Sequence, residues 1–150
     1  MTEPAFRRAV VEDWPAIRDL TRAAYARWVP LIGREPKPMT ADYEAAVRAH
    51  RFDLLEIEGA LAGLIETVDE GEVLLIENVA VAPERQGRGL GRVLMARAEA
   101  IARGLGRPRL RLYTNQKFAA NVRLYQALGY AIDREETSAL GVTTHMSKLI

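Results

Sequence analysis

One short run of this sequence alternates three glycines with larger residues, Gln86-Gly87-Arg88-Gly89-Leu90-Gly91. An apolar segment that ends at Pro83 lies before the run, and a stretch with helical periodicity follows it, so we expect a strand, a turn and a helix in succession. Glycine adopts positive φ angles and lets the backbone approach a ligand closely. The first N–H groups of a helix lack acceptors within the helix and carry the positive end of its dipole. The run therefore predicts an anion site of the kind that binds diphosphates.

The residues around the run narrow the choice of phosphate ligand. A nucleotide-binding P-loop would end in Gly-Lys-Ser/Thr, whereas Gly91 is followed by Arg92 and Val93. The dinucleotide fingerprint would need a glycine where Arg92 stands, so neither nucleotide pattern fits. Arg85, Arg88 and Arg92 can add charge-assisted hydrogen bonds at the rim. The alternative is a flexible turn without a ligand, which leaves the glycines at the start of a helix unexplained.

The periodicity of apolar residues predicts the remaining elements. Strands are expected at residues 6–10, 53–58, 61–68, 72–81, 109–113, 130–135 and 143–149. Helices are expected at residues 13–28, 42–50, 90–103 and 118–128. A strand–helix–strand unit thus lies within an otherwise antiparallel order, which predicts an α+β fold with a mixed sheet. No repeat or linker divides the sequence, so we expect a single domain over residues 1–150.

Local signals make further predictions for individual segments. Residues 30–38 are expected to form a loop, because regular structure is broken there by Pro30, Gly33, Pro36 and Pro38. Thr40 is expected to cap the helix at 42–50. In the helix at 90–103 the apolar stripe is expected to comprise Leu90, Val93, Leu94, Ala98 and Ile101. The continuously apolar segment 73–76 indicates a central strand covered on both faces.

Composition excludes several classes of protein. The 150 residues include no Cys, which excludes disulfides, thiolate catalysis and a Cys-based zinc site. The formal net charge is +1, so no overall basic field points to nucleic acid or an anionic membrane, although 18 of the 21 basic residues are Arg. No apolar run approaches the roughly 18 residues of a membrane helix. The start, Met1-Thr2-Glu3-Pro4, lacks a signal-peptide pattern, so we expect a cytoplasmic protein.

Three segments, in this order along the chain, resemble a known family. The glycine run is similar to the Arg/Gln-x-x-Gly-x-Gly/Ala signature of the GNAT acetyltransferase family. The preceding segment resembles that family's central strand and reads Asn78-Val79-Ala80-Val81-Ala82-Pro83. A later segment resembles the family's Leu-Tyr-x-x-x-Gly-Phe/Tyr pattern and reads Leu124-Tyr125-Gln126-Ala127-Leu128-Gly129-Tyr130. The resemblance implies a GNAT-like α+β fold, with a mixed, mostly antiparallel central sheet of about six to seven strands flanked by about four helices.

The resemblance also implies a chemistry. In this family an acetyl group passes directly from acetyl-CoA to an amine without a covalent enzyme intermediate, so we expect an N-acetyltransferase that uses acetyl-CoA and no metal. The pantetheine arm would bind the backbone of Val79, Ala80 and Val81, and an N–H near Val79 would polarise the acetyl carbonyl. The pyrophosphate would bind the glycine run and the residue after it, Gln86, Gly87, Arg88, Gly89, Leu90, Gly91 and Arg92.

The resemblance points to two catalytic side chains. Tyr125 matches the family's usual general acid, because a phenol with a pKa near ~10 stays protonated at neutral pH and can stabilise or protonate a departing thiolate. Glu77 is the leading base for the amine, directly or through water, and Glu66 is second. Many relatives carry a cofactor-binding Asn where this sequence has Phe118, and we expect Asn121 to replace it. Alternatively, Tyr125 is an aromatic residue packed on its helix, and Glu77, Glu66 and Asn121 are polar residues exposed to solvent.

The acceptor is expected to be a primary amine of a small molecule or a peptide, bound beside the first two helices. Its pocket is expected to include Tyr25, Trp28, Tyr43 and Glu66. The three aromatic residues can equally belong to the core, which is the better interpretation of Trp28 on its apolar helix stripe. His50 and His145 are isolated in the sequence, so we expect surface or packing roles for them and no metal site.

Two other functions remain open. A non-catalytic module that senses CoA or acyl-CoA would need the glycine run but neither Tyr125 nor an acidic base, and the presence of both favours an enzyme. A nucleic-acid binder with Arg-rich faces is disfavoured by the small net charge and by the lack of an uninterrupted basic run. A homodimer through the terminal strands or helices is compatible with the sequence.

Overall fold

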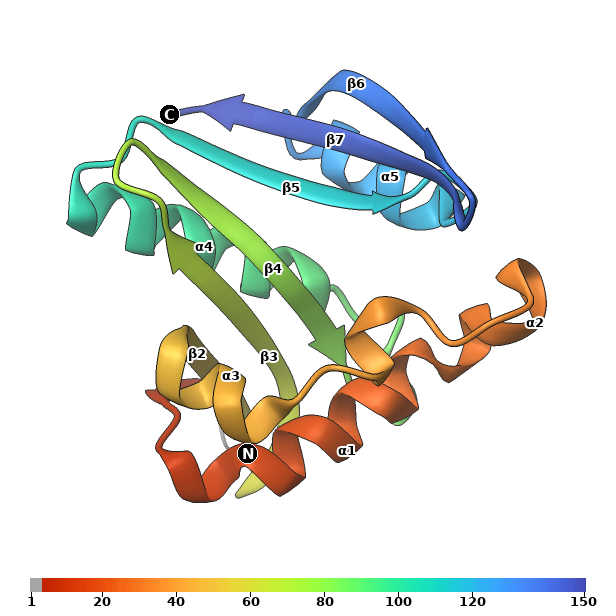
Figure 1. Cartoon of the computed structure of the whole chain (residues 1–150). Helices are drawn as coiled ribbons and strands as arrows, with labels where there is room; N and C mark the ends of the chain where they lie inside the picture. The colour runs from red at the N-terminus through yellow and green to blue at the C-terminus, as the bar shows by residue number, and fades with distance from the viewer. Residues whose placement is uncertain (1–3) are drawn as a thin grey trace.

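The computed structural model describes residues 4–150, so Met1, Thr2 and Glu3 of the N-terminal segment considered above lie outside the described residues. Seven strands form one sheet in the order β1-β2-β3-β4-β5-β7-β6. Figure 1 shows the middle of this sheet, with β3 beside β4 and β4 beside β5. Their bounds are β1 (Ala5–Arg8), β2 (Arg51–Ile57), β3 (Ala60–Asp69), β4 (Val73–Val81), β5 (Arg109–Asn115), β6 (Ala131–Ser138) and β7 (Gly141–Leu149). Neighbouring strands are antiparallel except for β4 and β5, which are parallel. The prediction of a mixed, mostly antiparallel sheet is confirmed.

Helices cover both faces of this sheet. Their bounds are α1 (Trp14–Tyr25), α2 (Val29–Ile32), α3 (Tyr43–Ala49), α4 (Leu90–Leu105) and α5 (Ala119–Ala127). Buried residues of α1 and α3 join the hydrophobic cluster on one face, and those of α4 join the cluster on the other. α5 lies beside β5 and β7 (Figure 1) and packs Val122 and Tyr125 against the α4 cluster. Among residues 4–150, no helix has the length and apolar character needed to cross a membrane.

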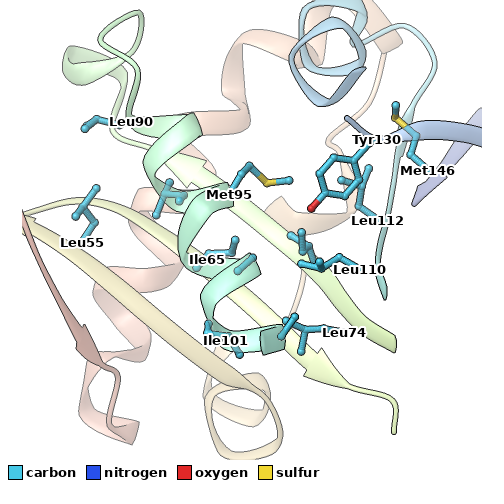
Figure 2. Packing of buried hydrophobic residues seen from close by; sticks show 14 of the residues in the cluster. Leu55, Ile65, Leu74, Leu90, Met95, Ile101, Leu110, Leu112, Tyr130 and Met146 are labelled. Carbon is cyan, nitrogen blue, oxygen red and sulfur yellow. The ribbon is translucent and has the colours of Figure 1, made fainter. Parts of the chain in front are cut away.

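Successive residues of the inner strands point to opposite faces, which builds two cores. On β2 and β3, Leu54 and Leu64 face α1 and α3, whereas Leu55 and Ile65 face α4. Figure 2 shows the larger core, in which Met95 and its neighbours on α4 pack onto the sheet. Full burial of such side chains contributes roughly 1.5–3 kcal/mol each. The two cores therefore fix both helical layers against the sheet.

Pro30 does not interrupt the helical segment, so the prediction of a loop over all of residues 30–38 is wrong. α1 continues through a 3-10 turn, Ala26–Trp28, into α2, and Pro30 lies in the first turn of α2. Proline is tolerated there because the N–H that it lacks would have no acceptor within the helix. The helical segment ends only at Gly33, whose φ of 73° is left-handed.

Two predictions about side chains are also wrong. Asp42, not Thr40, caps α3: its Oδ1 accepts a hydrogen bond from the backbone N–H three residues later at 3.1 Å. The Thr40 hydroxyl instead donates to the Lys37 carbonyl at 3.2 Å. On α4, Val93 is 38% exposed whereas Met95 is fully buried. The buried face of α4 is centred on positions 94, 98 and 101, which leaves position 93 at its edge.

A carboxylate is buried between β2 and α4. The Asp53 side chain is fully buried, and Arg51 Nε and Arg97 Nε each donate to one of its oxygens at 2.8 Å. Burial opposes ionisation, but the two guanidinium groups outweigh it and hold the pKa of Asp53 below its ordinary value. Because Arg97 lies on α4, this ion pair ties the helix to the strand beneath it.

Asp53→Asn is expected to lower the free energy of unfolding by about 2–3 kcal/mol, because two guanidinium groups would then face a neutral amide. Urea unfolding at neutral pH measures the change. Asp133→Asn is the matched control, because Asp133 is exposed on β6, and its effect should stay within about 0.5 kcal/mol. Equal effects of the two substitutions would contradict the assignment of the stabilising role to the buried pair.

The same pair predicts a dependence of stability on pH. An unfolded Asp titrates near ~4, and the folded pKa of Asp53 is lower. Its stabilisation is therefore complete above about pH 5 and is lost as the pH falls through the folded pKa. The difference in unfolding free energy between the wild type and Asp53→Asn should shrink on acidification from neutral pH toward about pH 3. A difference that grows on acidification would show that folding raises the pKa of Asp53 instead of lowering it.

Candidate active site

β4 and β5 separate after a short stretch of pairing. Their parallel ladder has four paired positions and ends at Ile76 and Leu112, although β4 continues to Val81 and β5 to Asn115. Figure 1 shows the two strands close together at one end and apart at the other. Beyond Ile76, no backbone of the described residues pairs with the edge of β4 that faces β5. A gap with one free strand edge therefore opens in the middle of the sheet.

Side chains identify the backbone groups that face this gap. The Val79 carbonyl lies 3.3 Å from the Tyr25 hydroxyl, and the Val81 carbonyl accepts a hydrogen bond from Gln86 Nε2 at 3.1 Å. In a strand, the N–H and C=O of one residue point to the same edge. The N–H groups of Val79 and Val81 therefore face the gap and remain free to donate.

A β-bulge places Glu77 where the ladder ends. The pairing between β3 and β4 shifts by one residue between Glu66 and Thr67, which leaves Glu77 as the extra residue of β4. The Tyr113 hydroxyl donates to Glu77 Oε1 at 2.6 Å. Both residues directly follow the last paired positions of their strands, so this hydrogen bond closes the narrow end of the gap.

The glycine run forms a turn directly before α4. Gly87 and Gly89 have φ angles of 78° and 80°, which larger residues adopt only with strain. Among the described residues, no acceptor is found for the backbone N–H groups of residues 87–92. A Cβ at Gly91 would lie 3.4 Å from Leu124 Cδ2, so the Leu124 side chain of α5 lies next to this end of the turn. The turn thus presents several free donors at the positive end of a helix.

The gap and the glycine turn open into one pocket of about 270 Å³. Most of the predicted site residues line it: Val79, Ala80, Val81, Gln86, Gly87, Gly89, Leu90, Gly91, Arg92, Asn121, Tyr125, Tyr25 and Trp28. The pocket also includes Ala24, Arg27, Arg85 and Leu124. Four predicted residues do not line it: Arg88, Glu77, Tyr43 and Glu66. Tyr25 and Trp28, which were expected on the acceptor side, thus share the pocket of the glycine turn.

The Gln86 side chain fastens the turn to β4. Its Nε2 donates to the Val81 carbonyl, and its Oε1 accepts a hydrogen bond from Arg27 Nη1 at 3.0 Å. The Arg27 guanidinium also lies 4.4 Å from the centroid of the Trp28 ring, in cation–π contact. Both ends of the Gln86 amide are therefore engaged, and the residue positions the turn. Sequence reasoning missed Arg27 because nothing distinguishes it among 18 arginines.

Two tyrosines of the pocket are held in the neutral form. The Tyr25 hydroxyl donates to Asn78 Oδ1 at 3.0 Å, and burial raises its pKa well above the ordinary value. Tyr125 lies on α5, and burial raises its pKa to about 12. At neutral pH both phenols are protonated, and Tyr125 brings an O–H donor to the pocket.

Tyr43 belongs to a buried polar network instead of the pocket. Its hydroxyl donates to the Pro38 carbonyl at 2.6 Å and accepts a longer hydrogen bond, at 3.4 Å, from Asn78 Nδ2. The same amide nitrogen reaches Thr21 Oγ1 at 3.3 Å. The network joins α1, α3 and the segment before α3 to β4 directly beside Glu77.

Glu66 and His50 form a pair that sequence reasoning missed. His50 Nδ1 and Glu66 Oε2 lie 2.7 Å apart, and Glu66 is 4% exposed. Burial raises the pKa of Glu66, and His50 offsets part of that rise. His50, whose side chain is 33% exposed, thus pairs with a buried carboxylate, and its expected lack of a catalytic role stays a prediction. His145, by contrast, lies 3.0 Å from the exposed Glu136.

An aromatic stack bridges the gap at its wide end. Phe118, 4% exposed at the start of α5, stacks on Trp28 with ring centroids 4.5 Å apart and an interplanar angle of 22°. Trp28 belongs to neither core cluster, so its interpretation as a core aromatic is wrong. Asn121 lies one turn further along α5 and lines the pocket. The stack thus joins α5 to the segment that follows α1.

These features define what the site can do chemically. The turn offers free N–H donors to an anion, the edge of β4 offers N–H donors to an extended polar chain, and Tyr125 offers a neutral hydroxyl. Within residues 4–150, no three His, Cys, Asp or Glu side chains cluster closely enough to hold a metal ion. The prediction that the protein uses no metal stays a prediction.

Comparisons with known proteins agree on one family. The family model described as the acetyltransferase (GNAT) family matches residues 14–130. A mycothiol acetyltransferase from Nocardiopsis dassonvillei is 42% identical over 89 residues, which cover 59% of this chain and 26% of that protein. The chain thus spans about a quarter of the length of this curated relative.

Solved structures show the same fold at low sequence identity. The PaiA N-acetyltransferase from Thermoplasma acidophilum, described in complex with coenzyme A, superposes with a TM-score of 0.78 at 17% identity and 99% coverage of both chains. The ribosomal-protein-S18-alanine N-acetyltransferase from Escherichia coli gives a TM-score of 0.78 at 20% identity, with 99% of this chain and 94% of that chain covered.

Proposed function

This chain belongs to the acetyltransferase (GNAT) family, and we propose that it is an N-acetyltransferase that transfers the acetyl group of acetyl-CoA directly to a primary amine of a small molecule or a peptide. The observation that carries the proposal is that the glycine turn and the free edge of β4 line one pocket. A ligand with a diphosphate and an extended amide arm engages both. Acetyl-CoA has this combination, and the relative described in complex with coenzyme A supports the choice.

The free donors of the pocket are matched to the parts of this ligand. The N–H groups of residues 87–92 bind the pyrophosphate at the start of α4, and Arg85 and Arg92 add cationic donors beside it. The N–H groups of Val79 and Val81 bind the amide arm along the edge of β4. The Val79 N–H also polarises the acetyl carbonyl, which develops negative charge as the amine attacks.

Tyr125 stabilises the departing thiolate. Its pKa of about 12 lies above the ~8.5 of an ordinary thiol, so transfer of its proton to the thiolate is uphill. A neutral phenol instead donates a strong hydrogen bond to the sulfur as negative charge develops there. Tyr125 therefore acts mainly through hydrogen-bond donation, and solvent supplies the proton that the thiol finally carries.

Glu77 receives the proton of the amine, directly or through water. An ordinary alkyl ammonium has a pKa near ~10.4 and must lose a proton before its nitrogen can attack. Glu77 lies at the narrow end of the gap, and its Oε1 is fixed by Tyr113. Glu66, the second predicted base, is nearly fully buried and already has His50 against its Oε2. Glu77 is the more accessible carboxylate, which supports its selection.

Acetyl-CoA and a panel of alkyl diamines, amino sugars and peptides with free N-termini are expected to yield free thiol with at least one of these amines. Mass spectrometry of the accepted amine should show the gain of one acetyl group. Controls without protein and without amine measure the spontaneous release of thiol. Binding of acetyl-CoA with no release on any amine would support a non-catalytic sensing module instead.

Tyr125→Phe is expected to lower kcat by about 100-fold, because it removes the donor to the thiolate while keeping the ring. The Kd for acetyl-CoA should change by less than about threefold, since the donor matters chiefly in the transition state. Tyr130→Phe is the matched control, because the ring centroids of Tyr130 and Tyr125 lie 6.3 Å apart and Tyr130 does not line the pocket. The Tyr130 hydroxyl has no hydrogen-bond partner among the described residues. Equal losses of kcat in both variants would remove Tyr125 from the mechanism.

Gly89→Ala is expected to weaken the binding of CoA about tenfold, measured by calorimetry, because a Cβ at φ 80° distorts the turn that presents the N–H groups. Gly106→Ala is the matched control at the opposite end of α4, where φ is 73° and the added Cβ also meets open space. Both variants should lose about 1 kcal/mol of stability, but only Gly89→Ala should change the Kd. Equal changes of Kd would show that the turn itself contributes no binding.

A further inference from the structure

We propose that Lys37 is an intramolecular acetyl acceptor, because the short turn η3 (Lys37–Met39) holds its ammonium over the ring of Tyr113, whose hydroxyl is bonded to Glu77. Lys37 Nζ lies 5.8 Å from the centroid of that ring. The inference rests on the proposed function, in which Glu77 receives the proton of the amine. A primary amine of the protein itself thus contacts the same side chain, Tyr113, that is hydrogen-bonded to the proposed base.

The segment that carries Lys37 is anchored beside Glu77. The Tyr43 hydroxyl donates to the carbonyl of Pro38, the residue after Lys37, at 2.6 Å. Asn78 Nδ2 in turn donates to the Tyr43 hydroxyl, and Asn78 follows Glu77 directly on β4. This chain of hydrogen bonds links the backbone next to Lys37 to the strand that carries the proposed base.

Lys37 also differs from the other two lysines of the chain, Lys117 and Lys148. Lys148 Nζ is bound to both oxygens of Glu99, at 3.2 and 3.1 Å. Lys37 is exposed and forms no ion pair with any residue in 4–150, so its nitrogen is free to react once it is deprotonated. Lys117 is likewise exposed and outside the ion pairs of the described chain, but no tyrosine or carboxylate of the site holds it. The rate of acetylation at Lys117 therefore measures the uncatalysed reaction.

The transfer balances without a further reactant. The Lys37 ammonium gives one proton to Glu77, and the nitrogen lone pair forms a bond to the acetyl carbonyl carbon. The carbon–sulfur bond breaks, and the sulfur leaves with the electron pair as a thiolate, which then takes up a proton. The products are an acetylated lysine and free CoA, and the second proton of the nitrogen passes to solvent as the amide forms, because Glu77 already carries the first.

The test incubates the full chain with acetyl-CoA in the absence of any amine and follows the modified residues by peptide mass spectrometry. We expect one acetyl group on Lys37, formed about tenfold or more faster than any on Lys117. The rate constant should not change when the protein is diluted tenfold, because the bound acetyl-CoA and its acceptor Lys37 belong to one complex. Tyr125→Phe should slow the reaction at Lys37 and leave that at Lys117 unchanged, and Lys37→Arg should retain turnover of an external amine.

Several results would overturn the inference, and they are distinguishable from failure of the proposed function. Equal rates at Lys37 and Lys117 would mean spontaneous chemistry, and a rate that falls on dilution would mean transfer between molecules. Turnover of an external amine with Lys37 unmodified would reject the inference and leave the proposed function intact. Absence of both reactions, with acetyl-CoA bound, would reject the proposed function itself.

Discussion

Backbone pairing between β4 and β5 stops at Ile76 and Leu112, and the two halves of the sheet diverge from there. Beyond this point the halves are held by side chains. On one face, α4 packs across both strands in the larger core. On the other side of the site, the Tyr113 hydroxyl bonds Glu77 at the narrow end and the Trp28–Phe118 stack bridges the wide end. The pocket exists because these contacts hold the strands apart without letting the ladder close.

The sequence was informative where one local signal decides the structure. Helix, strand and turn positions follow from periodicity and from glycine and proline, and the resulting mixed sheet is confirmed. Errors arose where two local signals compete. Pro30 fits the first turn of a helix as well as a loop, and Asp42 and Thr40 are both good capping residues. Neither choice can be made until the neighbouring elements are placed.

The same distinction separates the parts of the site. The glycine turn and residues 79–81 were predictable because each is a continuous segment, and both line the pocket. Contacts between distant segments were not: His50 meets Glu66, Arg27 meets Gln86 and Tyr113 meets Glu77 only after folding. These pairs join side chains of common types, and no spacing in the sequence marks them as partners.

The gap in the sheet also bears on edge-to-edge pairing between copies of this chain. An unpaired strand edge ordinarily recruits a strand from another chain and so promotes aggregation. One of the two outer edges of the sheet, β6, carries charged residues at positions 133–136, which discourage such pairing. The inner edge of β4 faces the pocket, and α1 and α4 cover the two faces of that strand. The free edge spans only residues 77–81 and lies between the two helical layers, so a strand from another chain would pair with it over few residues. The inner edge is therefore protected by its short length and the helices that flank it, and the β6 edge by charge.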